Sequence, residues 1–189
     1  MQAPSIRSSN AHGRLSSVLS TSVRLENVLG RGLGEARGAL SHMMYQLEQG
    51  HGCPTTMTFA AVREHASAIA EVSAERIRDE LLKIFRPPHA ARGLDLLRES
   101  GLLAEVLPEL ASTIGCEQPP EHHPEGDVFT HIRLMLSQLP ETVSIELSWS
   151  VLMHDIAKPV TFSCDDDGRI RFFGHEKIGE DMVRAILNR

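Results

Sequence analysis

The apolar run at residues 145–153 most limits what this chain can fold into, because it leads directly into His154 and Asp155 and then reaches Pro159. The run has helical character, and Pro159 predicts the point at which the helix stops. A charged pair near the end of a buried helix is unfavourable unless something neutralises it, and a metal ion is able to do so. The function of the pair therefore depends on whether other metal-binding side chains can reach it.

Helical periodicity dominates the chain from Thr58 onward. Expected helices cover residues 59–72, 89–100, 102–107, 127–139 and 175–189, and two more begin at Ser73 and Ser144 as N-caps. Strand-like residues at 160–164 and 169–173 flank the turn residues 165–168 and predict a β-hairpin. The sequence therefore predicts a mainly α fold with one small β-hairpin.

Composition predicts the domain organisation. Residues 1–55 are biased towards Ser, Gly and Arg and form a poorly defined N-terminal segment, with a weak helical pattern at residues 35–49. Residues 115–126 are rich in Gly, Pro, Glu and His, which is typical of a linker. We expect one helical region at 56–114 and a second at 127–189, which stops without a C-terminal cap and is expected to be truncated there.

Charge and cysteine content exclude several classes of protein. The net charge of −6 argues against a general nucleic-acid-coating protein, so RNA binding requires a local basic face. Such a face is expected at Arg76, Arg78, Lys83 and Arg86, although acidic residues interleave with them. The three cysteines are far apart and are expected to be reduced thiols of a cytoplasmic protein. No apolar run approaches the roughly 20 residues of a membrane span.

Three consecutive elements offer ligands for a divalent metal ion. His131 lies on the 127–139 helix, His154 and Asp155 end the next helix, and His175 follows the hairpin. Because successive antiparallel helices with short connections are neighbours, His131 is expected to face His154. Lys158, one turn after His154, could pair with a phosphate oxygen. The pattern predicts a site in which a metal ion activates water for attack on phosphorus.

Simpler interpretations stay open for the same residues. A single histidine on an apolar helix face, such as His131, is often a hydrogen-bonded core residue. The pair His122-His123 lies in the predicted linker and is expected to be solvated. The run of aspartates at residues 165–167 is expected to be a solvated turn, since it lacks the ligand spacing of a calcium loop.

Four motifs resemble one known family. Asp127-Val-Phe-Thr-His131, Leu152-Met-His-Asp-Ile-Ala-Lys-Pro159 and Gly174-His-Glu-Lys-Ile-Gly179 are similar to the HD region of bacterial CCA-adding tRNA nucleotidyltransferases and related poly(A) polymerases. The segment Ser73-Ala-Glu-Arg-Ile-Arg-Asp-Glu-Leu81 resembles the neck helix of that family. The resemblance covers roughly residues 58–189, and the order and spacing of the motifs make it specific.

The resemblance implies a helical, RNA-binding-like neck bundle followed by an HD-type metal-dependent helical domain with one β-hairpin. The metal ligands would be His131, His154, Asp155 and His175, and Asp155 and Lys158 would be the catalytic residues. The implied metal is Mg, Mn, Ni or Co. An HD site of this kind hydrolyses phosphomonoesters or 2′,3′-cyclic phosphates, so tRNA or another RNA 3′ end and a phosphorylated nucleotide are the expected partners.

Two departures from the family pattern limit that expectation. The palm domain, which carries a Gly-Ser motif and paired aspartates for nucleotide transfer, is not recognisable in this sequence, so nucleotidyltransferase activity is not expected. HD hydrolases usually add another Asp on a later helix, a position that this sequence does not reach. The alternative interpretation is a non-catalytic helical RNA-binding or scaffold module with a vestigial HD site.

Overall fold

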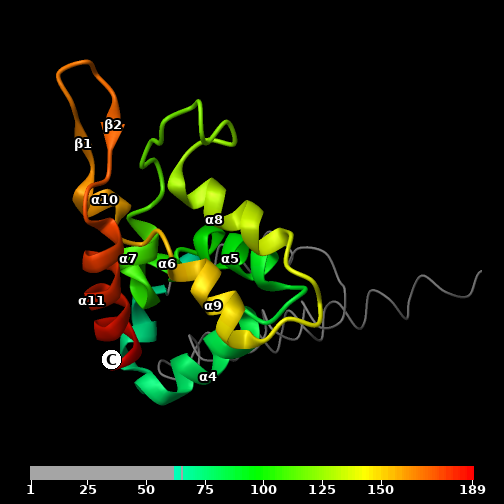
Figure 1. Ribbon diagram of the computed structural model, residues 1–189. Coiled ribbons are helices and arrows are strands. Elements are labelled where there is room, and N and C mark those ends of the chain that lie inside the picture. The colour runs from blue at the N-terminus through cyan, green and yellow to red at the C-terminus, as the bar shows by residue number, and fades with distance from the viewer. Residues whose placement is uncertain (1–61, 65) are drawn as a thin grey trace, which may run out of the picture.

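The computed structural model describes residues 62–64 and 66–189. In this part of the chain the fold is mainly α with one small antiparallel hairpin, which confirms the predicted fold class. In Figure 1 the helices gather into one body and the hairpin projects from it. The weak helix predicted at residues 35–49 lies outside the described residues.

The elements follow one another with short connections, except for the longer segment at residues 112–127 between α7 and α8. The first group consists of η1 (Ala66–Glu71), α4 (Ala74–Ile84), α5 (Ala90–Glu99), α6 (Leu102–Val106) and α7 (Pro108–Ala111). The second group consists of α8 (Val128–Ser137), α9 (Ile145–Met153), α10 (Lys158–Thr161), β1 (Ser163–Cys164), β2 (Ile170–Arg171) and α11 (His175–Leu187). None of the helices in the described ranges combines the length and the apolar character that a membrane crossing needs.

The first predicted helix takes a different form. The sequence predicts one α-helix at residues 59–72, whereas the structure has a short helical segment at residues 62–64 and the 3₁₀ helix η1. Side chains three apart eclipse in a 3₁₀ helix. Ala66 and Ile69 have this spacing and are both buried, so the tighter helix presents them to the core on one side.

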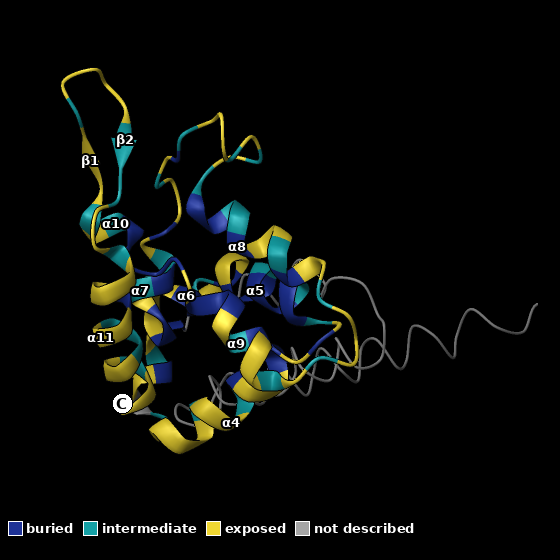
Figure 2. Cartoon of the chain, viewed as in Figure 1, coloured by how far each residue is buried: buried dark blue, intermediate teal, exposed yellow. Residues whose placement is uncertain are grey.

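One hydrophobic core joins the two predicted helical regions. The buried cluster runs from Val62 to Ile156 and includes Leu94 and Leu97 of α5 together with Phe129 and Ile132 of α8. Figure 2 shows the buried residues gathered where α5, α6 and α8 meet. The division into domains at residues 115–126 stays a prediction, and the helices on either side of that segment pack as one unit.

The ends of α8 and α9 are fixed by side-chain caps, as the sequence predicts. Asp127 accepts a hydrogen bond from the backbone N–H of Thr130 at 2.9 Å, and Ser144 accepts one from Leu147 at 3.3 Å. Ser73 occupies the N-cap position of α4 but its side chain makes no capping hydrogen bond. Its predicted position is correct and its predicted capping contact is wrong.

Pro159 begins a helix instead of ending one. The helix α9 ends at Met153, and Pro159 lies in the first turn of α10, where the missing N–H of a proline is not needed. Val160 and Thr161 therefore belong to α10, and the hairpin is shorter than predicted, with Ser163 opposite Arg171 and Cys164 opposite Ile170. The prediction of strands at 160–164 and 169–173 is wrong in extent and correct in topology.

Candidate metal centre

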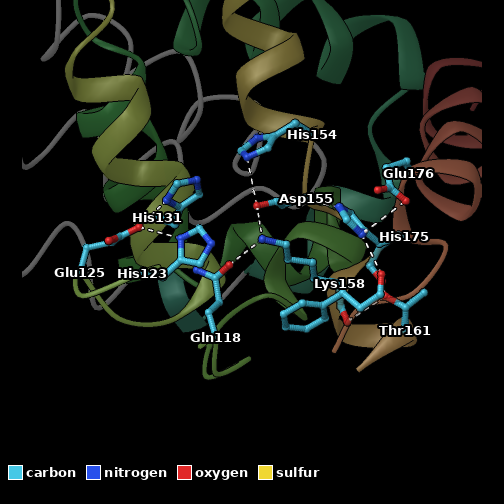
Figure 3. A network of polar contacts seen from close by, with 12 residues as sticks. Gln118, His123, Glu125, His131, His154, Asp155, Lys158, Thr161, His175 and Glu176 are labelled. Atoms are coloured by element: carbon cyan, nitrogen blue, oxygen red, sulfur yellow. Dashed lines mark hydrogen bonds and ion pairs between the residues drawn. The ribbon is translucent and has the colours of Figure 1, made fainter. Parts of the chain in front are cut away.

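The four predicted metal ligands lie on elements that converge on Asp155. His131 comes from the middle of α8, His154 is the C-cap of α9, and His175 is the first residue of α11. The ligand atoms of His131, His154 and Asp155 all lie within 4.8 Å of one another. The rings of His131 and His154 are 5.5 Å apart between centroids. Figure 3 shows these side chains around Asp155.

Asp155 is the buried centre of the network, with 5% of its surface exposed. Its Oδ2 atom lies 3.0 Å from Nε2 of His154 and 2.8 Å from Nζ of Lys158. Its Oδ1 atom lies 3.8 Å from Nε2 of His175. Burial alone would raise the pKa of Asp155, but the contacts with His154 and Lys158 reverse this and hold it well below its usual range. The carboxylate is therefore ionised and suited to bind a cation.

Two histidines turn the same ring nitrogen towards Asp155. Nδ1 of His154 lies 2.8 Å from the carbonyl oxygen of Val151, and Nδ1 of His175 lies 2.8 Å from that of Phe172. A carbonyl oxygen only accepts, so each Nδ1 carries the hydrogen and each Nε2 is left to face the carboxylate. This arrangement is common for histidines that bind a metal through Nε2.

The contact between His154 and Asp155 requires a positive species. With Nδ1 donating to Val151, Nε2 of a neutral ring would present a lone pair to Oδ2 of Asp155 at 3.0 Å. Partial burial alone would lower the pKa of His154, but the hydrogen bonds to Asp155 and Val151 outweigh it and raise the pKa. A proton satisfies the pair, and so would a divalent ion. Imidazole and carboxylate donors fit such an ion chemically.

A carboxylate holds the far side of His131. Oε1 of Glu125 lies 2.5 Å from Nδ1 of His131 and 3.1 Å from Nδ1 of His123, and the rings of the two histidines stand 4.7 Å apart. The backbone N–H of Glu125 and these two rings lower the pKa of Glu125 to about 2. Glu125 is thus an ionised partner that fixes the orientation of His131. These three residues are a second group whose donor atoms lie within 4.8 Å of one another.

Lys158 is the buried counter-charge of Asp155. Its ammonium also donates to Oε1 of Gln118 at 2.7 Å, and its residue is 7% exposed. The ammonium lies 5.3 Å from the centroid of the Phe172 ring. Lys158 is therefore held in place on three sides beside the carboxylate.

Sequence reasoning missed three residues of this network: Gln118, His123 and Glu125. All three lie in the segment predicted to be a linker, and the prediction that His123 is solvated is wrong, because its ring packs against His131. The segment is closed at its base by Asp127, whose Oδ2 accepts from the backbone N–H of Gly115 at 2.6 Å. The one signal in the sequence was the position of Glu125 two residues before the N-cap of the helix that carries His131.

The four predicted RNA-binding cations are all exposed, on α4 or just after it. Around the helix axis, Lys83 lies about 20° from Arg76, whereas Arg78 lies about 160° from it. Arg78 pairs with Asp79 at 2.9 Å, and Lys83 pairs with Glu80 at 3.0 Å. The structure brings Arg76 and Lys83 to one face of α4 and does not bring Arg78 to it.

Comparison with known proteins identifies the family. Residues 54–114 match the family described as "Probable RNA and SrmB- binding site of polymerase A". An A-adding tRNA nucleotidyltransferase of Deinococcus radiodurans is 37% identical over 152 residues, which cover 71% of this chain and 34% of that protein. The chain belongs to the CCA-adding tRNA nucleotidyltransferase and poly(A) polymerase family. This confirms the family indicated by the motifs.

Other members of the tRNA nucleotidyltransferase family match in the same way. A multifunctional CCA protein of Halorhodospira halophila is 35% identical over 133 residues, covering 68% of this chain and 31% of that protein. A CC-adding tRNA nucleotidyltransferase of Thermus thermophilus is 38% identical over 115 residues, covering 60% of this chain and 26% of that protein. The chain thus spans about a third of the length of these curated relatives or less. No solved structure gives a significant match.

Proposed function

We propose that the residues around Asp155 form a divalent-metal centre that hydrolyses phosphoesters at an RNA 3′ end or on a phosphorylated nucleotide. The observation that carries the proposal is the common orientation of His154 and His175, whose Nδ1 atoms are bound by backbone carbonyls and whose Nε2 atoms face one ionised carboxylate. His131, held by Glu125, would be the third imidazole. The metal would be Mg, Mn, Ni or Co, all of which accept nitrogen or oxygen donors.

Each residue of the centre has a chemical part in this proposal. A bound divalent ion supplies a Lewis acid for a phosphoryl oxygen. Asp155, His131 and His154 would hold the ion, and the low pKa of Asp155 keeps it an anionic ligand. Lys158 would orient a phosphate oxygen and, with Asp155, forms the catalytic pair of the proposal. His175 would bind either the ion or a phosphate oxygen, since its Nε2 lies 3.8 Å from Oδ1 of Asp155.

Metal content tests the centre directly. We expect His154→Ala and His131→Ala to lose bound metal after dialysis, as measured by elemental analysis. His89→Ala is the matched control, because His89 lies at the N-cap of α5 and outside both groups of candidate ligands. Equal metal content in the wild type, His154→Ala and His131→Ala would contradict the proposal.

Hydrolysis tests the activity. A chromogenic phosphodiester with Mn, Ni, Co or Mg should be turned over by the wild type and not by Asp155→Asn. Asp181→Asn is the control, since Asp181 is an exposed carboxylate of α11. Circular dichroism of Asp155→Asn shows whether it is folded, and His154→Ala serves as the second inactive variant. Turnover that survives in folded Asp155→Asn would reject the hydrolytic function.

We propose RNA binding as a second function, favoured by the family match at residues 54–114. Arg76 and Lys83 on one face of α4, together with Arg86 after it, would contact phosphates, and Arg78 would make a separate contact. Two of the relatives described above are named tRNA nucleotidyltransferases, so tRNA is the proposed partner, in a cytoplasmic setting. This function also stands alone if the metal centre is vestigial.

The salt dependence of tRNA binding tests this second function. Because each phosphate contact releases counterions, losing one should reduce the slope of log affinity against log salt by about 0.7 to 0.9. We expect this for Arg76→Gln and Arg86→Gln. Arg184→Gln is the control, since the exposed Arg184 of α11 already pairs with Glu180 at 2.9 Å. A slope that neither Arg76→Gln nor Arg86→Gln changes would rule out this face.

A further inference from the structure

A pocket opens beside the metal centre, between the hairpin and the segment at residues 115–126. Its volume is about 330 Å³, at the lower end of the range for small-molecule sites. His123, Lys158 and His175 of the polar network line it together with Arg171 and Phe173 of the hairpin region. The pocket therefore joins the candidate phosphate-binding groups to an aromatic side chain.

Phe173 is the unexplained member of this lining. It is 80% exposed, the highest fraction among the large apolar residues described. The neighbouring aromatic rings have partners: Phe172 packs on Phe162 at 5.9 Å and on His175 at 6.5 Å between centroids. In the described part of the chain, no aromatic or cationic partner lies over the ring of Phe173. The ring of Phe173 thus exposes a large apolar face in the lining of the pocket, which is unfavourable unless a ligand covers it.

The charged residues of the pocket lining include partners for an anion. Lys158 and Arg171 are cationic, and three histidines, His122, His123 and His175, contribute ring nitrogens. Glu176 is the acidic residue of the lining, and it lies 3.6 Å from Nδ1 of His175. A ligand that carries both a phosphate and a flat ring matches this lining, because the phosphate meets the cations while the ring meets Phe173.

We propose that Phe173 is a base-stacking residue, and that the pocket binds a terminal nucleotide with its phosphate at Lys158 and His175 and its base on Phe173. The inference rests on the proposed function for the phosphate end and adds the nucleobase as a recognised group. Stacking on an exposed ring tolerates every base, since each has a π-face. The pocket therefore distinguishes a nucleotide from a bare phosphate, and not one base from another.

The test compares ligands with and without a base on the full chain in the presence of Mn²⁺. Calorimetry gives the affinities of adenosine 3′-monophosphate and of inorganic phosphate for the wild type, Phe173→Ala and Phe173→Trp. We expect Phe173→Ala to weaken the nucleotide about 10-fold or more and to leave phosphate within about twofold. Phe173→Trp should restore the nucleotide affinity. Val160→Ala is the control, because Val160 is 63% exposed on α10 and does not line the pocket.

The outcomes separate the inference from the proposed function. A ratio of nucleotide to phosphate affinity that Phe173→Ala leaves unchanged overturns the stacking role, as does a wild type that binds neither ligand. If His154→Ala binds phosphate as tightly as the wild type does, the metal centre is contradicted. The effect of Phe173→Ala on the ratio of nucleotide to phosphate affinity still tests the stacking role. A short RNA with a 3′-phosphate, tested in parallel, distinguishes an RNA end from a free nucleotide: whichever binds more tightly and depends on Phe173 identifies the source.

Discussion

At the scale of single residues, Glu125 is the side chain whose contacts have the sharpest consequence. It accepts from Nδ1 of His131 and so leaves Nε2 of that ring for the group around Asp155. Partners of this kind orient a metal ligand and raise its basicity, and their loss typically lowers metal affinity about 10- to 100-fold. We expect Glu125→Gln to lower affinity for Mn²⁺ or Co²⁺ by that factor, as measured by calorimetry.

The control for Glu125 comes from the same segment. Glu121 is exposed, and Glu121→Gln removes the same charge four residues away. It should bind metal like the wild type, because only the contact with His131 matters in this account. Equal losses of metal affinity in Glu125→Gln and Glu121→Gln would mean that negative charge near the site determines the affinity. The orientation of His131 would then not be the cause.

The sequence predicted the residues of the candidate site that lie on regular elements and missed those of the loop. His131, His154 and His175 were predicted because helical periodicity and motif spacing place them, and the structure gathers them near Asp155. Gln118 and Glu125 could not be predicted in this way, since a loop has no periodicity that tells which side chain turns inward. Their positions depend on how Asp127 closes the loop against Gly115.

At the scale of elements, the contact between α4 and α5 depends on one glycine. A Cβ atom at Gly93 would lie 2.5 Å from Cγ2 and 2.9 Å from the carbonyl oxygen of Ile84. Since Ile84 is fully buried and one of these atoms is backbone, the helices would have to move apart. We expect Gly93→Ala to lower the free energy of unfolding by about 1–3 kcal/mol in urea titrations.

A second helical glycine gives the opposite expectation. In α11, a Cβ atom at Gly179 would lie 3.7 Å from Cβ of Ala157, an ordinary contact. Gly179→Ala should therefore gain helix propensity and raise the free energy of unfolding by up to about 1 kcal/mol. If both alanines change stability in the same direction, the close approach of α4 and α5 is not the cause.

The N-cap of α8 predicts an acid-dependent contribution to stability. Burial alone would raise the pKa of Asp127, but hydrogen bonds from Thr130 and Gly115 outweigh it and leave the pKa below its ordinary value of 3.8. A carboxyl whose pKa is lower in the folded state stabilises the fold above its unfolded pKa, and this contribution disappears as pH falls through the folded pKa. Asp127→Ala should cost about 1–2 kcal/mol at pH 7.

The measurement is the difference in free energy of unfolding between the wild type and Asp127→Ala as a function of pH. Urea unfolding of the wild type and Asp127→Ala from pH 7 to pH 3 should give a constant difference down to roughly pH 4 and a shrinking one below. Asp166→Ala is the control, because Asp166 is exposed in the hairpin turn. A difference that persists unchanged at the lowest pH would show that the charge of Asp127 contributes nothing.

Regular elements were predicted well where local chemistry decides them and poorly where packing does. Asp127 and Ser144 cap their helices because their side chains satisfy free N–H groups, which the sequence alone implies. Pro159 is compatible both with the end of a helix and with the first turn of another. The second form occurs because α9 already ends at Met153. Local sequence could not decide between these two roles.

At the scale of the whole molecule, α11 has few buried residues for its length. Its one buried residue is Gly179, whereas α5 buries six of its residues. Figure 2 shows α11 mostly exposed along its length. Near its C-terminal end, the guanidinium of Arg189 pairs with Glu109 at 3.1 Å. Since few buried contacts mean a low free energy of local opening, amides of α11 should exchange with deuterium faster than those of α5 and α8.

Metal binding should slow the amide exchange of α11 relative to α5 and α8 if His175 is a ligand. His175 begins α11 and faces Asp155, so an ion held by both would tie the first turn of α11 to the core. At a free metal concentration about 100 times the dissociation constant, linkage allows about 2.7 kcal/mol of added stability, or roughly 100-fold slower exchange. We expect that slowing at residues 175–179 with Mn²⁺, measured by hydrogen exchange and mass spectrometry.

The variant His175→Ala separates the two roles left open for this histidine. If His175 binds the ion, the variant still binds Mn²⁺ through His131, His154 and Asp155, and α11 loses its metal-dependent slowing while α8 and α9 keep theirs. If the wild type itself shows slowing at α8 and α9 and none at α11, His175 does not bind the ion. Its Nε2 would then be left for a phosphate oxygen in the pocket that it lines with Lys158 and Phe173.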